Sequence, residues 1–336
     1  MSVPSQDTVL IISNKYDEHA DAMVEVLDRR GGNIFRLNTE DLPREVVLIW
    51  RNDRCTLQYH GRTLDVRAVR SCWFRRPSSA KPHPEIADAG IHTVIEDESA
   101  FVLAGLYRCL GHATWVSHPD ALVRSRFKPY QLYVARQLGF VVPDTLITND
   151  PETFRQFYEE HSGSVIVKIG GRGPTTIPQN ETIYTSRISE SDLTGADDIR
   201  FMPHLFQAYV EKAYEVRVTI IGDRCFAVRI DSQSREETRI DWRHYEDGWV
   251  RCVPMELPTD IEAQCVALVQ GFGLSFGAID LIVRPDGEYV FLEINPNGQW
   301  LWIEDVTELP LSAALADVLL GCESATKKGG VDVRVA

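Results

Sequence analysis

The chain has 336 residues, enough for about two domains with a sizeable core. With 44% hydrophobic and 25% charged residues, it has the composition of an ordinary soluble globular protein. Its formal net charge of −14 opposes nucleic-acid binding, and its apolar stretches are only as long as strands, so we expect neither a nucleic-acid nor a membrane partner. Seven cysteines without a C-x-x-C pair, and no secretory leader, predict a cytoplasmic protein with reduced thiols.

The first third of the chain predicts a βαβ unit. Residues 9–12 form a β-branched run, residues 17–30 carry apolar side chains at helical spacing, and a second strand follows. No G-x-G-x-x-G motif is present, so we do not expect a dinucleotide site here. Residues 48–69 alternate like antiparallel strands, a helix is predicted over 91–110, and a domain boundary is placed near 117–120.

Two lysines and a glycine-rich loop predict a phosphate site that differs from a P-loop, because the G-x-x-x-x-G-K-[ST] pattern is missing. Lys128 lies in a helix predicted over 125–138, and Lys168 lies on a strand whose apolar residues face the other way. Residues 170–176 are rich in small and hydroxyl side chains, and their backbone N–H groups could close over phosphates. Taken alone, each lysine is better explained as a surface charge. Their significance lies in their spacing relative to an acidic hairpin.

That hairpin spans residues 276–299, with a turn signalled by Pro-Asp-Gly at 285–287. Glu293 and Asn295 are two positions apart and therefore project from one face of a strand. An even-numbered loop would place Asp280 on that same face, whereas an odd-numbered loop would place it opposite. In the even case three oxygen ligands converge, as Mg²⁺ prefers. The alternative is a solvated edge hairpin.

A polar segment at 232–248 contains the tripeptide Asp241-Trp242-Arg243. In extended conformation Asp241 and Arg243 share one face, so Trp242 could anchor the segment while the charged pair faces a substrate. An arginine can hold a carboxylate through two parallel hydrogen bonds. An exposed loop without a binding role is the alternative explanation.

Several segments make the chain resemble the ATP-grasp superfamily and, more narrowly, the microviridin-type (graspetide) peptide ligases. The narrower resemblance rests on WFRRP at 73–77, WVSHP at 115–119, KPYQL at 128–132, PDTLITN at 143–149 and DWR at 241–243. It covers nearly the whole chain and implies an α/β (α+β) protein with the ATP-grasp fold and a Rossmann-like pre-ATP-grasp domain. The expected parts are that domain at 1–118, a central subdomain with the lysines and glycine-rich loop at 119–200, a C-terminal subdomain with the Mg²⁺ site at 201–321, and a tail at 322–336.

The resemblance implies an ATP site. It matches Lys128 and Lys168, with Gly171 and Gly173 in the following loop, to groups that contact phosphate, and Glu215 to an acid near the ribose. The hinge that reads the adenine edge through backbone groups corresponds to Gln207, Ala208, Tyr209 and Val210. Many relatives carry Glu at the position of Ala208. We expect little consequence because backbone atoms read the base.

The resemblance also implies a metal site and an acceptor site. Asp280, Glu293 and Asn295 match Mg²⁺ ligands, with two ions expected. Arg217 matches the arginine of a Glu-x-Arg pattern that faces the acceptor acid and the transferred phosphate. We expect Arg217 and Arg243 to orient that acid, while Asp241 orients Arg243 or the incoming hydroxyl or amine.

The implied reaction uses ATP to join side chains of a precursor peptide, with leader and core segments, into ω-ester or ω-amide rings. A homodimer is one expected assembly. The rival hypotheses are a ligase that adds a free amino acid to a carboxylate, an ATP-grasp kinase and a non-catalytic nucleotide-binding protein. In WFRRP, Trp73 and Phe74 are expected in the core. Arg75 and Arg76 are either interdomain contacts or peptide-binding groups.

Overall fold

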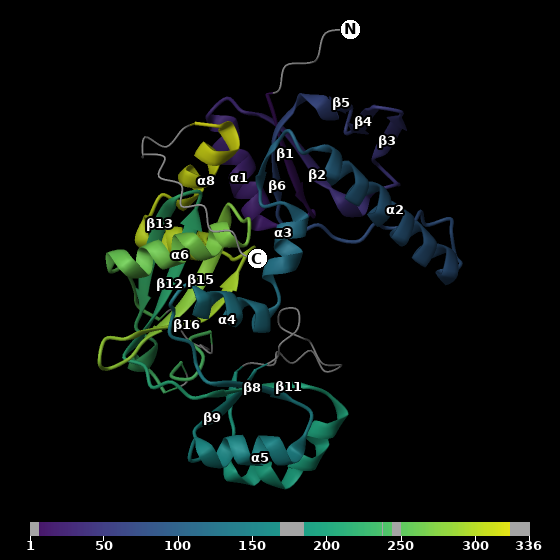
Figure 1. The fold of residues 1–336 in the computed structure, drawn as a ribbon. Coiled ribbons are helices and arrows are strands. Elements are labelled where there is room, and N and C mark those ends of the chain that lie inside the picture. The colour runs from purple at the N-terminus through teal and green to yellow at the C-terminus, as the bar shows by residue number, and fades with distance from the viewer. Residues whose placement is uncertain (1–6, 169–184, 237, 244–249, 323–336) are drawn as a thin grey trace.

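The computed structural model describes residues 7–168, 185–236, 238–243 and 250–322, which form four β-sheets with helices between and around them (Figure 1). Within these ranges, no helix has the length and apolar character needed to cross a membrane. The mixed α/β class predicted from the sequence is confirmed.

The N-terminal part is built on a parallel sheet in the order β2-β1-β6-β7, as the βαβ pattern predicts. Asp17 accepts a hydrogen bond from the His19 backbone N–H and so caps the first helix. The strands are β1 (Thr8–Ser13), β2 (Asn33–Asn38), β6 (Val69–Phe74) and β7 (Thr114–Val116), and the helices are α1 (Glu18–Arg29) and α2 (Ala89–Cys109).

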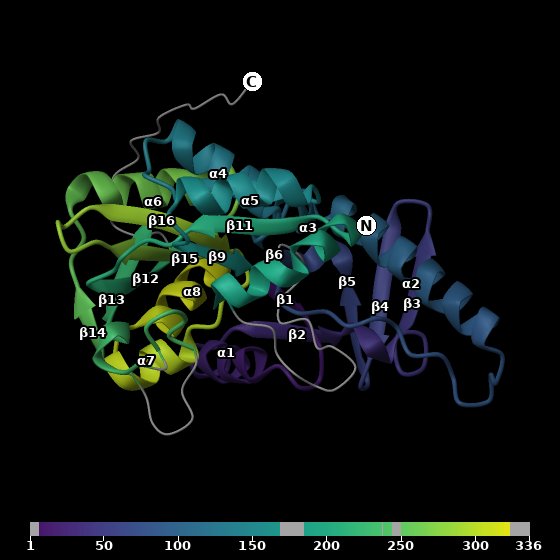
Figure 2. The ribbon, with the colours of Figure 1, turned by 90° about the horizontal axis from the view of Figure 1, so that it is seen from below.

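The alternating segment at 48–69 divides between two sheets. Most of it forms an antiparallel meander of β3 (Val47–Arg51), β4 (Arg54–Tyr59) and β5 (Arg62–Asp65), flanked by the short turns η1 (Thr39–Asp41) and η2 (Val66–Ala68). His60 and Gly61 have φ values of 49° and 73°, and two positive values are what a tight type I′ hairpin turn requires. Val69 instead begins β6 of the parallel sheet. The meander and α2 project at one end of the molecule (Figures 1 and 2).

A separate lobe holds an antiparallel sheet in the order β10-β9-β11-β8 (Figure 1). Its helices cover one face, where Phe154, Phe157, Val165 and Phe206 form a small core. The elements are β8 (Thr145–Thr148), α5 (Pro151–Glu160), β9 (Val165–Lys168), β10 (Ser186–Arg187), η3 (Glu190–Phe201) and β11 (His204–Ala208).

The largest sheet is antiparallel, in the order β14-β13-β12-β15-β16. Its strands are β12 (Tyr214–Ile221), β13 (Arg224–Ile230), β14 (Cys252–Met255), β15 (Phe276–Val283) and β16 (Tyr289–Asn295). The short turn η4 (Ser232–Ser234) follows β13, and the remaining helices are α6 (Thr259–Gly271), α7 (Leu301–Thr307) and α8 (Leu311–Leu320).

Helices α3 (Pro119–Ser125) and α4 (Lys128–Gln137) also pack on the largest sheet. The helix predicted over 125–138 is present as α4, but it begins three residues later than predicted, and α3 before it was not predicted. The second helix begins at Lys128 because Pro129 lacks an N–H and is tolerated only in a first turn. Leu122, Leu132 and Ala135 share a core with the sheet. The start of the expected 119–200 subdomain therefore packs with the C-terminal sheet.

The opposite face of the largest sheet joins the N-terminal part. Val9 and Ile11 of β1 and Met23 of α1 belong to one apolar cluster with Leu315 and Leu319 of α8. Burial of this shared apolar surface holds the two parts together.

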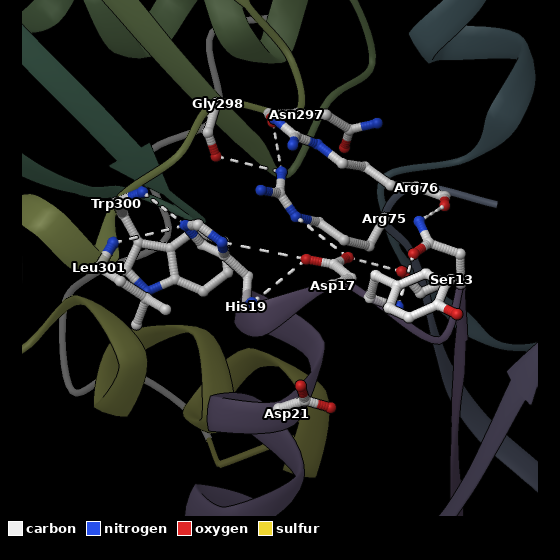
Figure 3. A network of polar contacts seen from close by, with 12 residues as sticks. Ser13, Asp17, His19, Asp21, Arg75, Arg76, Asn297, Gly298, Trp300 and Leu301 are labelled. Carbon is white, nitrogen blue, oxygen red and sulfur yellow. Dashed lines mark hydrogen bonds and ion pairs between the residues drawn. The ribbon is translucent and has the colours of Figure 1, made fainter. Parts of the chain in front are cut away.

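A buried polar network lies in the same interface, and Figure 3 shows it from close by. His19 Nε2 accepts hydrogen bonds from the backbone N–H groups of Trp300 at 3.1 Å and Leu301 at 3.5 Å, at the start of α7. An imidazole nitrogen can accept only when it carries no proton. Burial lowers the pKa of His19 to about 3, and the nearby Arg75 guanidinium acts in the same direction.

We therefore expect stability to fall as the pH drops below 6.5, the ordinary pKa of histidine. Between that value and about 3, the unfolded chain binds a proton that the folded His19 excludes, so the free energy of unfolding decreases with falling pH. One such group accounts for roughly 2 kcal/mol over about 1.5 pH units. Urea unfolding at pH 6.5 and 5 measures the difference. His19→Gln, which can still accept, should remove most of it, and an unchanged difference in that variant would contradict the assignment.

Candidate active site

In the acidic hairpin, Asp280 and Glu293 lie on the same face because of a β-bulge. The pairing of Val283 with Tyr289 leaves five residues in the loop, an odd number. That count alone would put Asp280 and Glu293 on opposite faces. A β-bulge at Leu292 inserts one extra residue into β16, so Asp280 lies directly opposite Glu293 after all. The convergence thus depends on the bulge and not on an even loop.

Each carboxylate has a cationic partner. Arg217 on β12 lies opposite Asp280 in register, and its Nη1 donates to both carboxylate oxygens, at 2.7 and 2.8 Å. Lys128 Nζ, at the start of α4, lies 2.9 Å from Glu293 Oε2. Because two acids side by side need compensating charge, these pairs explain how the hairpin tolerates them.

Electrostatic coupling joins the central lobe to the hairpin through Lys168, the last residue of β9. Burial lowers the pKa of Lys168 to about 8, although the Glu293 carboxylate favours its charged form. Burial disfavours ionised Glu293 as well, but the ammonium groups of Lys128 and Lys168 hold its pKa below the usual range. Burial raises the pKa of Asp280, and the Glu293 carboxylate adds to this effect against the Arg217 guanidinium. One site therefore contains groups from both sheets.

The site also contains Lys212, which the sequence analysis missed. Its Nζ donates to Glu215 Oε1 at 2.7 Å and to the Ile240 carbonyl at 3.0 Å, and both side chains of the pair are buried. Burial raises the pKa of Glu215, against the opposing effect of Lys212. The only sequence signal was a lysine three residues before the glutamate, which is equally typical of an exposed turn. Lys212 ties the polar segment 232–243 to the strand that carries Arg217.

Asp241 and Arg243 form a bidentate pair, with Nε at 2.8 Å from Oδ1 and Nη2 at 2.6 Å from Oδ2. Burial raises the pKa of Asp241, but the hydrogen bonds and charge of Arg243 outweigh this and lower it. The Trp242 ring packs on Trp302 of α7, with ring centroids 5.0 Å apart. The segment is a turn and not the extended strand that the alternation presumed, because the Arg243 N–H also donates to Asp241 Oδ1 at 3.2 Å. The charges of Glu293 and Asp280 also raise the pKa of Arg243, after the larger effect of Asp241.

The expected hinge lies at the end of β11. Gln207 is buried, and its Nε2 donates to Thr145 Oγ1 at 3.0 Å. The N–H groups of Ala208 and Tyr209 already donate to backbone carbonyls, at 2.9 and 2.8 Å. An adenine contact at this hinge would therefore use other backbone atoms, among them those of Val210.

Of the four residues that the sequence predicts to contact phosphate, the structure describes two. Lys128 contacts Glu293 of the acidic hairpin, and Lys168 is near enough to lower the pKa of Glu293. Gly171 and Gly173 fall outside the described residues. The ammonium groups of Lys128 and Lys212 disfavour the charged form of Lys168, so the positive charges are concentrated. Such a concentration of positive charge attracts polyanions such as a triphosphate.

The donor set fits a magnesium ion. Asp280, Glu293 and Asn295 offer hard oxygen atoms, and strand alternation puts Asn295 on the same side as Glu293. Arg217 and Lys128 supply the positive charge that these carboxylates need in the structure. A bound divalent cation would supply the positive charge that these carboxylates need.

The protein has two antiparallel sheets after a Rossmann-like domain, and the charge of Lys168 on one sheet lowers the pKa of Glu293 on the other. This arrangement defines an ATP-grasp fold. Residues 8–122 match the family described as the MvdD pre-ATP-grasp domain. A RiPP-associated ATP-grasp ligase from Chryseobacterium gregarium, solved with ADP and a leader and core peptide, superposes with a TM-score of 0.86 at 29% identity, over 95% of this chain and 98% of that one. Macrocyclase MdnB from Microcystis aeruginosa MRC superposes with a TM-score of 0.76 at 30% identity, over 94% and 99%.

A more distant relative is N-acetylaspartylglutamate synthase A of Mus musculus, 25% identical over 301 residues, which are 84% of this chain and 76% of that protein. The chain belongs to the ATP-grasp ligases, in the microviridin-type group that matures ribosomal peptides, and it is an enzyme. The resemblance identified from the sequence is thereby confirmed.

Proposed function

We propose that this enzyme uses ATP to activate Glu or Asp side chains of a ribosomal precursor peptide as acyl phosphates. Thr, Ser or Lys side chains then close ω-ester or ω-amide rings, with release of ADP and phosphate. The observation that carries the proposal is the cluster of Lys128, Lys168 and Arg217 around Asp280 and Glu293. The peptide complexed with the Chryseobacterium gregarium ligase supports a leader-plus-core substrate.

The chemistry begins with a carboxylate, which is a poor electrophile. Magnesium, as two ions held by Asp280, Glu293 and Asn295, would neutralise charge on the phosphate oxygens. Lys168 holds positive charge where negative charge develops during phosphoryl transfer, and Lys128 reaches the same place from α4. The phosphorylated carbonyl then accepts a hydroxyl or amine of the same peptide, so the enzyme must mainly position the two groups.

Arg217 and Arg243 are the proposed clamps for the acceptor acid. Arg217 is buried within the sheet, and half of the Arg243 side chain is exposed, which suits contact with an entering peptide. Asp241 holds the Arg243 guanidinium in one plane and would orient it or the attacking nucleophile. Lys212, with Glu215 near the ribose, would couple this segment to bound nucleotide.

We predict that Arg243→Ala and Arg243→Lys both impair ring closure while ATP binds at near-normal affinity. A lysine cannot reproduce the planar, bidentate contact of the guanidinium, although it keeps the charge. Titration calorimetry with a non-hydrolysable ATP analogue measures binding, and mass spectrometry of the peptide measures cyclisation. Wild-type cyclisation by Arg243→Lys, or loss of nucleotide binding in either variant, would refute the role.

The proposed function is tested with a synthetic leader-plus-core peptide, rich in Thr and Glu or Asp, encoded beside this gene. With ATP and Mg²⁺, each ring should remove one water from the peptide mass, and one ADP should form per ring. A peptide that gains phosphate without losing water would instead identify a kinase.

A second candidate is a ligase that joins a free amino acid to a carboxylate. It is favoured by the similarity to N-acetylaspartylglutamate synthase A. The peptide would then gain the mass of an amino acid only when one is supplied. The charged pair Asp241–Arg243 at the site favours the peptide substrate. A cytoplasmic location and a homodimer remain proposals.

A further inference from the structure

Arg75 is a charged residue that lies almost completely inside the protein. It follows β6 in the N-terminal domain, and 1% of its surface is exposed. Its Nη1 donates to the backbone carbonyls of Asn297 and Gly298, the latter at 3.2 Å (Figure 3). The N-terminal domain thus reaches into the loop that follows β16.

That loop begins at the proposed metal ligand. Asn295 Oδ1 accepts the Asn297 N–H at 3.0 Å, and the Asn295 carbonyl accepts the Gly298 N–H at 3.2 Å. The two residues whose carbonyls accept from Arg75 therefore also donate their backbone N–H groups to Asn295. The side-chain oxygen of Asn295 is separated from Arg75 by a single residue.

The same loop packs against Arg217. A Cβ on Gly298 would lie 2.4 Å from Ala278 Cβ and 3.0 Å from Arg217 Nη2, so only glycine fits between the sheet and the loop. A shift of the loop would therefore displace the Arg217 side chain as well as Asn295.

Several groups hold the Arg75 guanidinium in place. Asp17 Oδ2 lies 3.7 Å from its Nε, and Ser13 donates a 2.5 Å hydrogen bond to that same carboxylate oxygen. The Arg75 guanidinium carbon lies 5.3 Å from the Trp300 ring centroid, a cation–π contact. Within the described part of the chain, Nε and Nη2 have no hydrogen-bond partner. Burying this charge costs free energy, and the Asn297 and Gly298 carbonyls receive the two hydrogen bonds that it makes.

We infer that Arg75 is a positioning residue of the active site: by holding Asn297 and Gly298 it sets the side chain of Asn295 for metal binding and keeps Arg217 in place. The inference rests on the proposed function, because it presumes that Asn295 binds a metal ion. Of the two roles that the sequence left open for Arg75 in WFRRP, interdomain contact or peptide binding, the structure shows the interdomain contact. That contact ends at the loop that follows Asn295.

A purely structural role would make Arg75 an ordinary link between domains, and Arg30 provides the matched control. Arg30, after α1, donates to the Ala313 carbonyl at 3.2 Å and to Asp317 at 2.5 Å in α8, without contact to the Asn295 loop. Both arginines therefore connect the N-terminal domain to a backbone carbonyl of the C-terminal part. Only one of them touches the loop.

The experiment compares Arg75→Lys, Arg75→Met and Arg30→Met in the full chain. Mn²⁺ binding in the presence of ADP is followed by electron paramagnetic resonance, ADP binding without metal by calorimetry, and stability by thermal melting. Groups that orient a metal ligand typically contribute about 10–100-fold to metal affinity. We expect a loss of that size in both Arg75 variants, with metal-free ADP affinity unchanged. Arg75→Lys should melt at a higher temperature than Arg75→Met but bind Mn²⁺ no more tightly. Arg30→Met should lower only the melting temperature.

Gly298→Ala supplies a second line of evidence if an Arg75 variant fails to fold. It displaces the loop while leaving Arg75 in place, and it should weaken Mn²⁺ binding in the same way. Wild-type Mn²⁺ affinity in Arg75→Lys or in Gly298→Ala would overturn the inference and leave the proposed function intact. A wild-type protein that binds neither ADP nor Mn²⁺ would overturn both.

Discussion

Glu293→Gln is expected to abolish ATP turnover while the fold stays intact. The substitution keeps the shape of the side chain but replaces one ligand of a shared cation site by a neutral group. It also removes the negative charge that lies 2.9 Å from Lys128 Nζ. The loss should be at least on the order of 10²–10³ in rate, which is the typical effect of removing one preorganised charge at a transition state. Release of ADP measures turnover, and circular dichroism checks the fold.

Glu288→Gln is the matched control for this prediction. Glu288 lies in the turn of the same hairpin and pairs with Arg284 at 2.9 Å on the protein surface. Exposed ion pairs of this kind contribute little to stability, so the variant should turn over ATP like the wild type. Turnover that survives in Glu293→Gln, or that a chelator leaves undiminished, would exclude the metal role of the hairpin.

Lys168→Ala is expected to lose most ATP turnover without loss of stability. The Lys168 ammonium group is near enough to lower the pKa of Glu293, and from there it can stabilise charge on transferred phosphate. Its removal should cost ~3–4 kcal/mol, on the order of 10²–10³ in rate. Because burial lowers the pKa of Lys168 to about 8, the folded state disfavours the charged lysine at neutral pH. The alanine variant should therefore melt no lower than the wild type.

Lys15→Ala serves as the control for Lys168. Lys15 also pairs with carboxylates, 2.6 Å from Asp41 and 3.3 Å from Glu45, but it lies in the N-terminal domain. Its removal should lower stability and spare turnover, the opposite of the result for Lys168. A loss of under about threefold in Lys168→Ala would place that lysine outside the site.

Strand geometry underlies what the sequence predicted for the acidic hairpin. Residues two apart on a strand share a face, which assigns Glu293 and Asn295 to one side whatever the rest of the fold does. That rule does not apply to Asp241-Trp242-Arg243, because this segment forms a turn and not a strand. The rule could not decide the position of Asp280, because a one-residue slip exchanges the two faces of a strand and the bulge at Leu292 has no sequence signature.

By itself the sequence determined the α/β class, the family and the local patterns: an initial βαβ unit, an acidic hairpin, and lysines in a particular order. These depend on neighbours within a few positions, or on motifs that can be matched residue by residue. Tertiary structure alone decided that Lys212 is buried against Glu215, that α4 packs on the large sheet, and that Arg75 ends at the Asn295 loop. The two carbonyls that accept hydrogen bonds from Arg75 are more than two hundred residues away along the chain. Local periodicity carries no information about which distant segments burial will bring together.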